Sequence, residues 1–418
     1  MENCEKGLRV NVIGYEPESA NSNTRTRNMF RISRLQEVMK SLPRDGFDRL
    51  VREHGSNKHS KGFGSWQQLV AMVYGQLAGA GSLRELEAGF NSQRSHHYHL
   101  GCSPVRRSTL ADANAKRSTT LFAAVAQGLM VGAERSARGE VKQLLVALDS
   151  TSITLKGRGF DDWSAGPRTR HTQGLKVHVG YAVDAQVPIS QSITAPNVND
   201  IEEAVRLPLQ AATTYVFDKG YYDYNWWHRI DAAQATFVTR FKRNAGLTLV
   251  RARRVPRVAH GLVLSDEMVR FTHRHPSGGR RNHYVKPLRR IVIARPDHPR
   301  PLVLATNDLN SPALQIARHY QQRWQIELLF KWIKQHLRIK RFLGRSENAV
   351  RIQILTALIS YLLLTLYRRT HHLQQSLWTV LAELRASLFQ RPAIEHHWYH
   401  QRKRAREQLA QLQPSLFT

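Results

Sequence analysis

Residues 142–155, KQLLVALDSTSITL, mark the point at which this 418-residue chain changes from a helical to a β-rich pattern. An apolar run followed by β-branched residues is typical of a buried strand. The segments downstream of it are two strands around a turn (176–194), a helix (201–207), a strand (213–220), a helix (224–234) and a strand (236–243). This order of three neighbouring strands, helix, strand, helix and strand predicts an α/β domain.

The regions on either side of this α/β segment have different patterns. Residues 1–28 are polar without periodicity and are expected to form a disordered tail, whereas residues 29–140 are patterned as helices. Residues 244–305 contain several β runs broken by a glycine-rich segment, and residues 346–418 are helical and basic. We therefore predict a helical N-terminal domain, an α/β domain at 141–345 with a β-rich insertion, and a helical C-terminal region.

The charge balance predicts a polyanionic partner. The chain has 62 Lys and Arg residues against 32 Asp and Glu, which gives a net charge of +30 and a pI near 10.8. Charge alone leaves DNA, RNA and acidic lipid open. No membrane partner is expected, because the apolar run at 352–367 is short for a span and contains polar residues. The use of 2 cysteines fits a reducing cytoplasm.

Two aspartates end predicted strands and are candidate site residues. Asp149 ends LLVALD and Asp218 ends YVFD. If the two strands are neighbours, these carboxylates meet at one edge of the sheet, where the cost of burying charge favours acids paired around a metal. Each aspartate alone is more often a turn or cap residue. Asp184, which ends VGYAVD before a turn-like DAQVP, is predicted to be such a turn residue.

One helix-length stretch, residues 319–342, combines a polar stripe with an otherwise apolar surface. At roughly 100° per residue, Tyr320, Arg323, Glu327 and Lys334 fall within an arc of about 60°. The other faces carry Trp324, Ile326, Leu328, Leu329, Phe330, Trp332 and Ile333, so the helix is expected to pack into a core. One acid flanked by two cations and a phenol suits an anionic ligand, although Glu327 could also simply pair with Arg323.

The residue types suggest metal-assisted phosphoryl chemistry. Three carboxylates, Asp149, Asp218 and Glu327, without nearby Cys or His ligands suit Mg²⁺ or Mn²⁺. Two such ions about 4 Å apart could activate a water or a 3′-hydroxyl for displacement at a phosphodiester. Arg323 could then hold the phosphate together with Lys334 and Tyr320.

These residues resemble a known family. The spacing of Tyr320, Arg323, Glu327 and Lys334 is similar to the Y-R-E-K signature of bacterial insertion-sequence DDE transposases, the family numbered four. The likeness covers roughly residues 141–345, and residues 63–101 are similar to the N-terminal domain that accompanies this catalytic domain in many members. The segments that resemble the family's two aspartate motifs and the stretches between them are 144–155, 215–223, 176–184 and 194–207.

The resemblance implies an RNase H-like mixed sheet with a β-rich insertion, preceded by a helical domain that binds DNA ends. It implies that Asp149, Asp218 and Glu327 bind two Mg²⁺ ions, with Mn²⁺ as a substitute. It also implies that Tyr320, Arg323 and Lys334 grip the terminal phosphate and a hairpin intermediate. The expected partners are double-stranded DNA, as terminal inverted repeats and target, and a second copy of the chain.

Two further residue assignments stay open. Relatives often stack a tryptophan of the insertion on a flipped base, but residues 245–306 contain none, so His273, His275 or Tyr284 are candidate substitutes. Lys176 and His178 alternate on one strand and are expected beside Asp149, with Lys176 as a candidate to support it.

The expected function is cut-and-paste DNA transposition in the bacterial cytoplasm, at the nucleoid. The alternatives are an RNase H-like nuclease or resolvase, and a catalytically inactive DNA-binding relative.

Overall fold

The computed structural model describes residues 32–164, 173–275, 279–296, 298–339 and 341–390. The tail predicted at residues 1–28 and the basic run at residues 402–406 lie outside the described residues. Arg34–Phe389 forms one compact unit, and this unit contains all the elements discussed below.

The described strands form a single nine-stranded sheet. Its order is β3-β2-β1-β4-β5-β9-β8-β7-β6, so the first strand in sequence lies inside the sheet. The strands are β1 (Leu144–Thr154), β2 (Gly174–Ala182), β3 (Val187–Thr194), β4 (Thr213–Phe217), β5 (Thr236–Arg240), β6 (Leu247–Ala252), β7 (Val263–Phe271), β8 (Leu288–Ile293) and β9 (Leu302–Thr306).

The first five strands have the RNase H-like arrangement that the resemblance implies. Strands β1, β2 and β3 pair antiparallel, whereas β1 with β4 and β4 with β5 pair parallel. The crossovers between the parallel strands contain α10 (Asp200–Ala204) and α11 (Tyr224–Ala232). The predicted order of strands and helices is therefore confirmed.

The β-rich insertion continues the same sheet. Strand β9 pairs antiparallel with β5, and β8, β7 and β6 follow it outward. The sequence pattern indicated strand segments near β6, β8 and β9 but missed β7, because Asp266 and Glu267 interrupt its apolar alternation. In the structure Asp266 is buried and forms an ion pair of 2.6 Å with Arg289 of β8, which compensates its charge within the strand.

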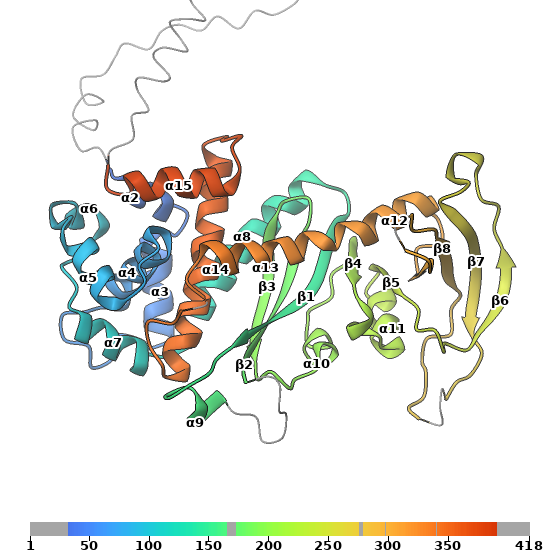
Figure 1. The fold of residues 1–418 in the computed structure, drawn as a ribbon, viewed down its shortest axis with the longest axis horizontal. Coiled ribbons are helices and arrows are strands. Elements are labelled where there is room, and N and C mark those ends of the chain that lie inside the picture. The colour runs from blue at the N-terminus through green and yellow to red at the C-terminus, as the bar shows by residue number, and fades with distance from the viewer. Residues whose placement is uncertain (1–31, 165–172, 276–278, 297, 340, 391–418) are drawn as a thin grey trace, which may run out of the picture. The chain divides into compact units, whose positions relative to one another are not determined.

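The helical part of the unit is built from both ends of the chain. Its elements are α2 (Arg34–Met39), α3 (Arg44–Glu53), α4 (Ser65–Ala78), α5 (Leu83–Asn91), η1 (Arg94–His96), α6 (His97–Leu100), α7 (Arg107–Lys116), α8 (Thr119–Glu140), α14 (Glu347–Thr370) and α15 (Leu377–Ser387). Helix α14 packs against α2, α4, α7 and α8. In Figure 1 these helices, except α8, lie on one side of the RNase H-like strands and the insertion strands lie on the other.

Helix α14 is long and apolar enough to cross a membrane by length and composition, yet 89% of its apolar window is buried within the protein. Its polar residues are buried too, and the Gln353 side chain donates to the backbone carbonyl of Arg341 at 2.9 Å. These contacts are those of a core helix, as expected for the apolar run at 352–367.

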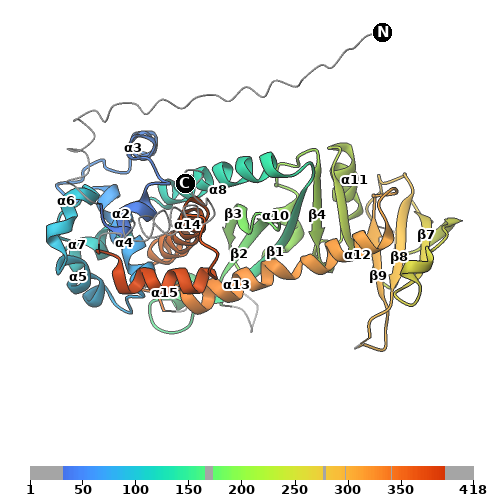
Figure 2. The ribbon, with the colours of Figure 1, turned by 90° about the horizontal axis from the view of Figure 1, so that it is seen from above.

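Helices cover both faces of the RNase H-like strands. The stretch predicted as one helix at residues 319–342 is α12 (Ala313–Gln322) followed by α13 (Trp324–His336), joined at Arg323. Alternate residues of β1 enter two cores: Leu148 packs in the core that includes α8, and Ala147 packs in the core that includes α13. Figure 2 shows α8 on one side of β1–β3 and α13 on the other.

Candidate active site

The two strand-end aspartates lie next to each other at one edge of the sheet. The parallel register of β1 and β4 pairs Leu148 with Phe217, and Asp149 and Asp218 are the next residue on each strand. The carboxyl ends of adjacent parallel strands bring these side chains to the same edge. The condition for a shared site, that the two strands are neighbours, is therefore met.

Arg323 connects Asp149 to Glu327. Its guanidinium Nη1 lies 3.4 Å from Asp149 Oδ2, and its Nη2 donates to Glu327 Oε1 at 2.6 Å. The Arg323 side chain is 16% exposed, so little water competes for these contacts. The helix pair that the sequence left as an alternative, Arg323 with Glu327, is thus present, but the same arginine also reaches Asp149.

The electrostatics of Asp149 show that positive charge is in short supply at this edge. Burial raises the pKa of the Asp149 carboxyl to about 6, against lowering by the Ser150 N–H, which donates to Oδ1 at 2.8 Å, and by Arg323. The charges of Asp218 and Glu327 raise this pKa further. Arg323 therefore contacts two of these three acids, Asp149 and Glu327.

Tyr320 and Lys334 reach the strand ends on either side of these acids. The Tyr320 ring lies 5.8 Å from the Arg240 guanidinium at the end of β5. Lys334 Nζ donates to Thr151 Oγ1 at 2.5 Å and to the Ser152 carbonyl at 3.1 Å, both on β1. Tyr320, Arg323 and Lys334 therefore contact strand ends of the sheet directly, and Glu327 is joined to Asp149 through Arg323.

Two residues predicted to pack in the core on α13 do not. Trp324 is 56% exposed and Leu328 is 42% exposed, so that prediction was wrong for them. They follow each other by four residues and form one exposed stripe, while Ile326, Leu329 and Ile333 face the sheet and are buried. The helix packs through one stripe only, which the apolar composition did not distinguish.

Lys176 lies on the opposite face of the sheet from Asp149, contrary to expectation. The β1–β2 register pairs Asp149 with Val179 and Ser152 with Lys176, so Lys176 and Asp149 are on different faces. Lys176 Nζ instead lies 3.3 Å from Asp200 Oδ1. Asp184 lies in the turn between β2 and β3, as predicted.

Asp200 was missed from the sequence although it contacts the site. It is the first residue of α10, and its Oδ1 accepts from Ser150 Oγ at 2.6 Å. Acidic residues are common at the start of a helix, where they interact favourably with the helix dipole. The sequence pattern therefore did not distinguish Asp200 from an ordinary residue of this kind. Its stretch, 194–207, resembles a family segment, and that was the only signal.

The candidate stacking residues differ in access. Tyr284 is only 4% exposed and packs in the core, so it cannot receive a base. His273 and His275 are exposed on the insertion. Trp226 and Trp227 of α11 are buried against the sheet, which is a packing role.

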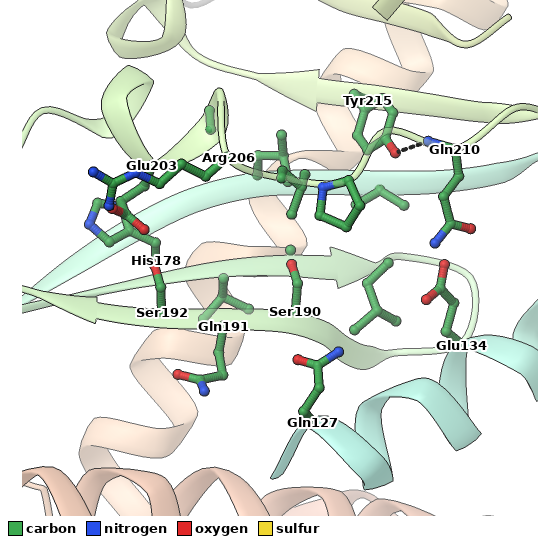
Figure 3. Close-up of a pocket in the computed structure, with 18 of the residues that line it drawn as sticks. Gln127, Glu134, His178, Ser190, Gln191, Ser192, Glu203, Arg206, Gln210 and Tyr215 are labelled. Atoms are coloured by element: carbon green, nitrogen blue, oxygen red, sulfur yellow. Dashed lines mark hydrogen bonds and ion pairs between the residues drawn. The ribbon is translucent and has the colours of Figure 1, made fainter. Parts of the chain in front are cut away.

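A cavity of about 480 Å³ lies behind β1, between α8, β3 and the segment that contains α10. Figure 3 shows His178, Glu203 and Arg206 at one end of it and Tyr215, Gln210 and Glu134 at the other. Leu148 lines this cavity, and the strand alternation puts Asp149 on the other face. The cavity is therefore separate from the edge where Asp149, Asp218 and Glu327 meet, although Asp200 lines it.

The donor set fits a hard divalent cation in its chemistry. Asp149, Asp218 and Glu327 offer carboxylate oxygens, which Mg²⁺ and Mn²⁺ prefer. Within the described ranges, however, no three His, Cys, Asp or Glu side chains are gathered closely enough to hold one ion. In this arrangement Arg323 supplies positive charge to two of these acids, Asp149 and Glu327.

Comparison with known families identifies the class of protein. Residues 141–363 match the model of the Transposase DDE domain, and residues 31–103 match a domain of unknown function, DUF4372. The first match covers more than half of the chain, so the chain belongs to the DDE transposases, a family that acts on DNA and generally uses divalent metal ions.

Individual relatives point the same way. The chain is 42% identical over 275 residues to a Sinorhizobium fredii protein assigned as a transposase, y4zB. The aligned residues make up 65% of this chain and 74% of that protein. It is 30% identical over 234 residues to a Geobacillus stearothermophilus protein assigned as the transposase of insertion sequence element IS5377. Here the aligned residues make up 54% of this chain and 57% of that protein.

Among solved structures, a piggyBac transposase synaptic complex with hairpin DNA overlaps with a TM-score of 0.44 at 11% identity, covering 94% of this chain and 87% of that one. Such a loose overlap does not bear on the fold or the chemistry.

Proposed function

We propose that the chain is the transposase of an insertion sequence and carries out cut-and-paste transposition by metal-dependent phosphodiester hydrolysis and strand transfer. The observation that carries this proposal is that Asp149 lies at the strand ends of an RNase H-like sheet, next to Asp218 on the neighbouring strand and joined to Glu327 through Arg323. A nuclease or resolvase could use a similar edge, but the full Tyr320, Arg323, Glu327 and Lys334 set favours a Y-R-E-K transposase.

In this proposal Asp149, Asp218 and Glu327 hold two Mg²⁺ ions, which Mn²⁺ can replace. Bound there, the ions would polarise the scissile phosphate and lower the pKa of the attacking water or 3′-hydroxyl. Burial, and to a lesser extent the charges of Asp218 and Glu327, raise the pKa of Asp149 to about 6, so a bound cation would stabilise its ionised form.

Arg323 changes partners when the substrate binds. A guanidinium that bridges two carboxylates can instead bind a phosphate through the same parallel N–H donors. Its departure frees Asp149 and Glu327 for the metal, while its charge follows the phosphate. Lys334 adds a second cation about three helical turns beyond Arg323, and Tyr320 borders the other side.

The steps share one kind of chemistry. The enzyme nicks at the transposon end, the freed 3′-hydroxyl attacks the opposite strand to form a hairpin, water reopens the hairpin, and the end joins target DNA. Each step displaces one oxygen at phosphorus by another, so one set of carboxylates serves all of them. Paired terminal inverted repeats call for two copies of the chain, so we infer a homodimer in the DNA complex.

We also propose that residues 29–140 bind the transposon ends, with catalysis at residues 141–345. An open groove of about 490 Å³ between the α3–α4 loop and α7 supports this role. Lys58, Lys61 and Lys116 line the groove, and no ion pair joins them to an acid in the part of the chain that the structure describes. Arg117, which follows α7, holds the loop by donating to Ser60 Oγ at 3.4 Å and to the Phe63 carbonyl. Unpaired lysines on this loop and at the end of α7 suit a phosphate backbone.

The test is cleavage of DNA that carries the element's flanking ends, with Mg²⁺ or Mn²⁺, resolved on a denaturing gel. The intact protein is compared with Glu327→Gln and with Glu347→Gln, a control that removes the acid of an equivalent helix pair with Arg351 on α14. We expect nicks and hairpins with the intact protein and the control, and neither with Glu327→Gln, while all three bind the ends.

Binding without cleavage by the intact protein with either ion would contradict the proposal. It would favour an inactive DNA-binding relative in which Glu327 serves only as the partner of Arg323.

A further inference from the structure

Asp200 contacts the segments of both strand-end aspartates from the face of the sheet opposite Glu327. Its side chain is 24% exposed, so it is partly shielded from water. It belongs neither to the Y-R-E-K set nor to the three carboxylates proposed to hold metal. Its contacts can be followed to Asp149 and to Asp218 in turn.

The first contact runs through Ser150. The Ser150 hydroxyl donates to Asp200 Oδ1 at 2.6 Å, while the Ser150 backbone N–H donates to Asp149 Oδ1 at 2.8 Å. The same residue therefore holds one oxygen of each acid. A shift of the Ser150 backbone would move the hydrogen bond that orients the Asp149 carboxylate.

On its other side, Asp200 lies close to the turn that follows Asp218. The Gly220 N–H donates to Asp218 Oδ1 at 2.6 Å. A methyl group built on Gly220 would lie 2.9 Å from Asp218 Oδ1 and 3.3 Å from Asp200 Oδ2, so the glycine fits between the two carboxylates without room for a side chain. The two oxygens of Asp200 thus face the Asp149 segment and the Asp218 segment.

The charge of Asp200 is held by groups of β2. Lys176 Nζ lies 3.3 Å from Oδ1, and the same ammonium donates to the Val198 carbonyl at 2.8 Å. His178 Nδ1 lies 3.5 Å from Oδ1. Burial lowers the pKa of His178 despite the nearby acids, so Lys176 supplies the counter-charge at neutral pH.

Helix capping does not account for these contacts. Asn199 precedes α10, and its backbone N–H and side chain both donate to Glu202 Oε1, at 3.4 and 2.8 Å. The start of this short helix is therefore served by Asn199 and Glu202. The Asp200 carboxylate is left to its partners on β1 and β2.

We propose that Asp200 is a positioning residue that fixes the spacing of the Asp149 and Asp218 carboxylates from behind the sheet, through Ser150 and Gly220. The inference rests on the proposed function, because it assigns Asp200 to the support of the proposed metal-binding acids. Groups that orient metal-binding carboxylates typically change metal affinity or activity by about 10- to 100-fold when they are removed.

The experiment compares Asp200→Asn, Ser150→Ala and the double variant with Glu203→Gln, whose acid lies on the same helix and pairs with Arg206 at 2.6 Å. Mn²⁺ binding is measured by electron paramagnetic resonance without DNA, nicking is measured on end-bearing DNA, and folding is followed by thermal unfolding. We expect Asp200→Asn to weaken Mn²⁺ binding and slow nicking, each by about tenfold or more, with end binding and the unfolding temperature nearly unchanged.

The double variant separates positioning from general damage. If Asp200 acts through Ser150, the double variant should bind Mn²⁺ and nick DNA nearly as well as Asp200→Asn does, because both substitutions remove the same hydrogen bond. Additive losses, or a fall in unfolding temperature that matches the loss of Mn²⁺ binding, would overturn the proposal in favour of a structural role.

Failure of the proposed function is distinguishable. If the intact protein does not nick DNA, that function fails, and the Mn²⁺ measurement alone then judges Asp200. If the intact protein nicks and Asp200→Asn binds Mn²⁺ and nicks at the same level, the function stands and the positioning role is wrong.

Discussion

Two clusters of this chain combine an arginine with aspartate or glutamate, but they differ in how completely the charges are paired. In the insertion, Arg289 donates to both oxygens of Asp266, at 2.8 and 2.6 Å, and to the Ser311 carbonyl at 2.5 Å. At the strand ends, Arg323 gives one contact each to Asp149 and Glu327. The first cluster satisfies its charges, whereas the second leaves acids that share one cation.

The difference shows how a structural ion pair can be told from a functional one. A buried pair with matched hydrogen bonds has no reason to release either partner. A carboxylate whose pKa is raised to about 6 by burial, with two more acids nearby, gains from any added cation. The comparison therefore supports a stabilising role for Asp266 and the metal-binding role that we propose for Asp149.

The largest expected effect is on activity at the strand ends. Asp149→Asn should slow nicking of end-bearing DNA by about 10⁴-fold or more, because an amide cannot replace a charged oxygen ligand. Asp184→Asn, at an exposed turn, is the matched control and should nick normally. Single-turnover cleavage with Mg²⁺ measures both, and an Asp149→Asn protein within tenfold of the intact one would break the comparison.

The next effect is on stability in the insertion. Asp266→Ala leaves Arg289 buried without its carboxylate and should lower the free energy of unfolding by about 3–5 kcal/mol. The double change Asp266→Leu with Arg289→Met should recover at least half of that loss, since apolar side chains can replace a buried pair. Urea unfolding at neutral pH measures both, and a double variant no more stable than Asp266→Ala would contradict this account.

The sheet could be predicted because its signals are local. Apolar runs at β1, β4 and β5 and the helices between them show in the residue order, and the parallel crossover then brings Asp149 and Asp218 together. Strand β7 could not be found in this way, since Asp266 is neutralised by residues of other segments, chiefly by Arg289, 23 residues away, and also by Arg253. The pairing of β9 with β5 also depends on contacts between distant segments.

The site could be predicted only in part, for the same reason. The spacing of Arg323 and Glu327 shows in sequence, whereas the reach of Arg323 to Asp149 requires α13 to lie over β1. Asp200 accepts a hydrogen bond from Ser150, which lies 50 residues away in the sequence. The face of the sheet on which Lys176 lies depends on the register of β1 and β2, and a shift of one residue would reverse it. Such contacts come from packing, which no local pattern records.

A smaller effect concerns pH and stability. The pKa of Asp149 is about 6 in the folded chain against an ordinary 3.8, so folding favours its protonated form. The resulting penalty is absent below about pH 4 and fully present above about pH 6, so the contribution of Asp149 to stability falls as pH rises. With a chelator present, the free energy of unfolding of Asp149→Asn should exceed that of the intact protein by about 3 kcal/mol at pH 7.5 and by little at pH 4. Equal pH slopes in urea unfolding would count against it.

The smallest effect tests whether Arg323 competes with metal for its acids. Arg323→Met removes the cation that Asp149 and Glu327 now contact, so Mn²⁺ should bind about three- to tenfold more tightly. Nicking should nevertheless slow by about tenfold, because the phosphate loses its bidentate partner. The control is Arg351→Met, from the helix pair with Glu347 on α14, which should change neither quantity. Opposite signs for metal binding and nicking would place Arg323 between the metal and the DNA, whereas weaker Mn²⁺ binding would mean that Arg323 holds the carboxylates in place, as Arg289 holds Asp266.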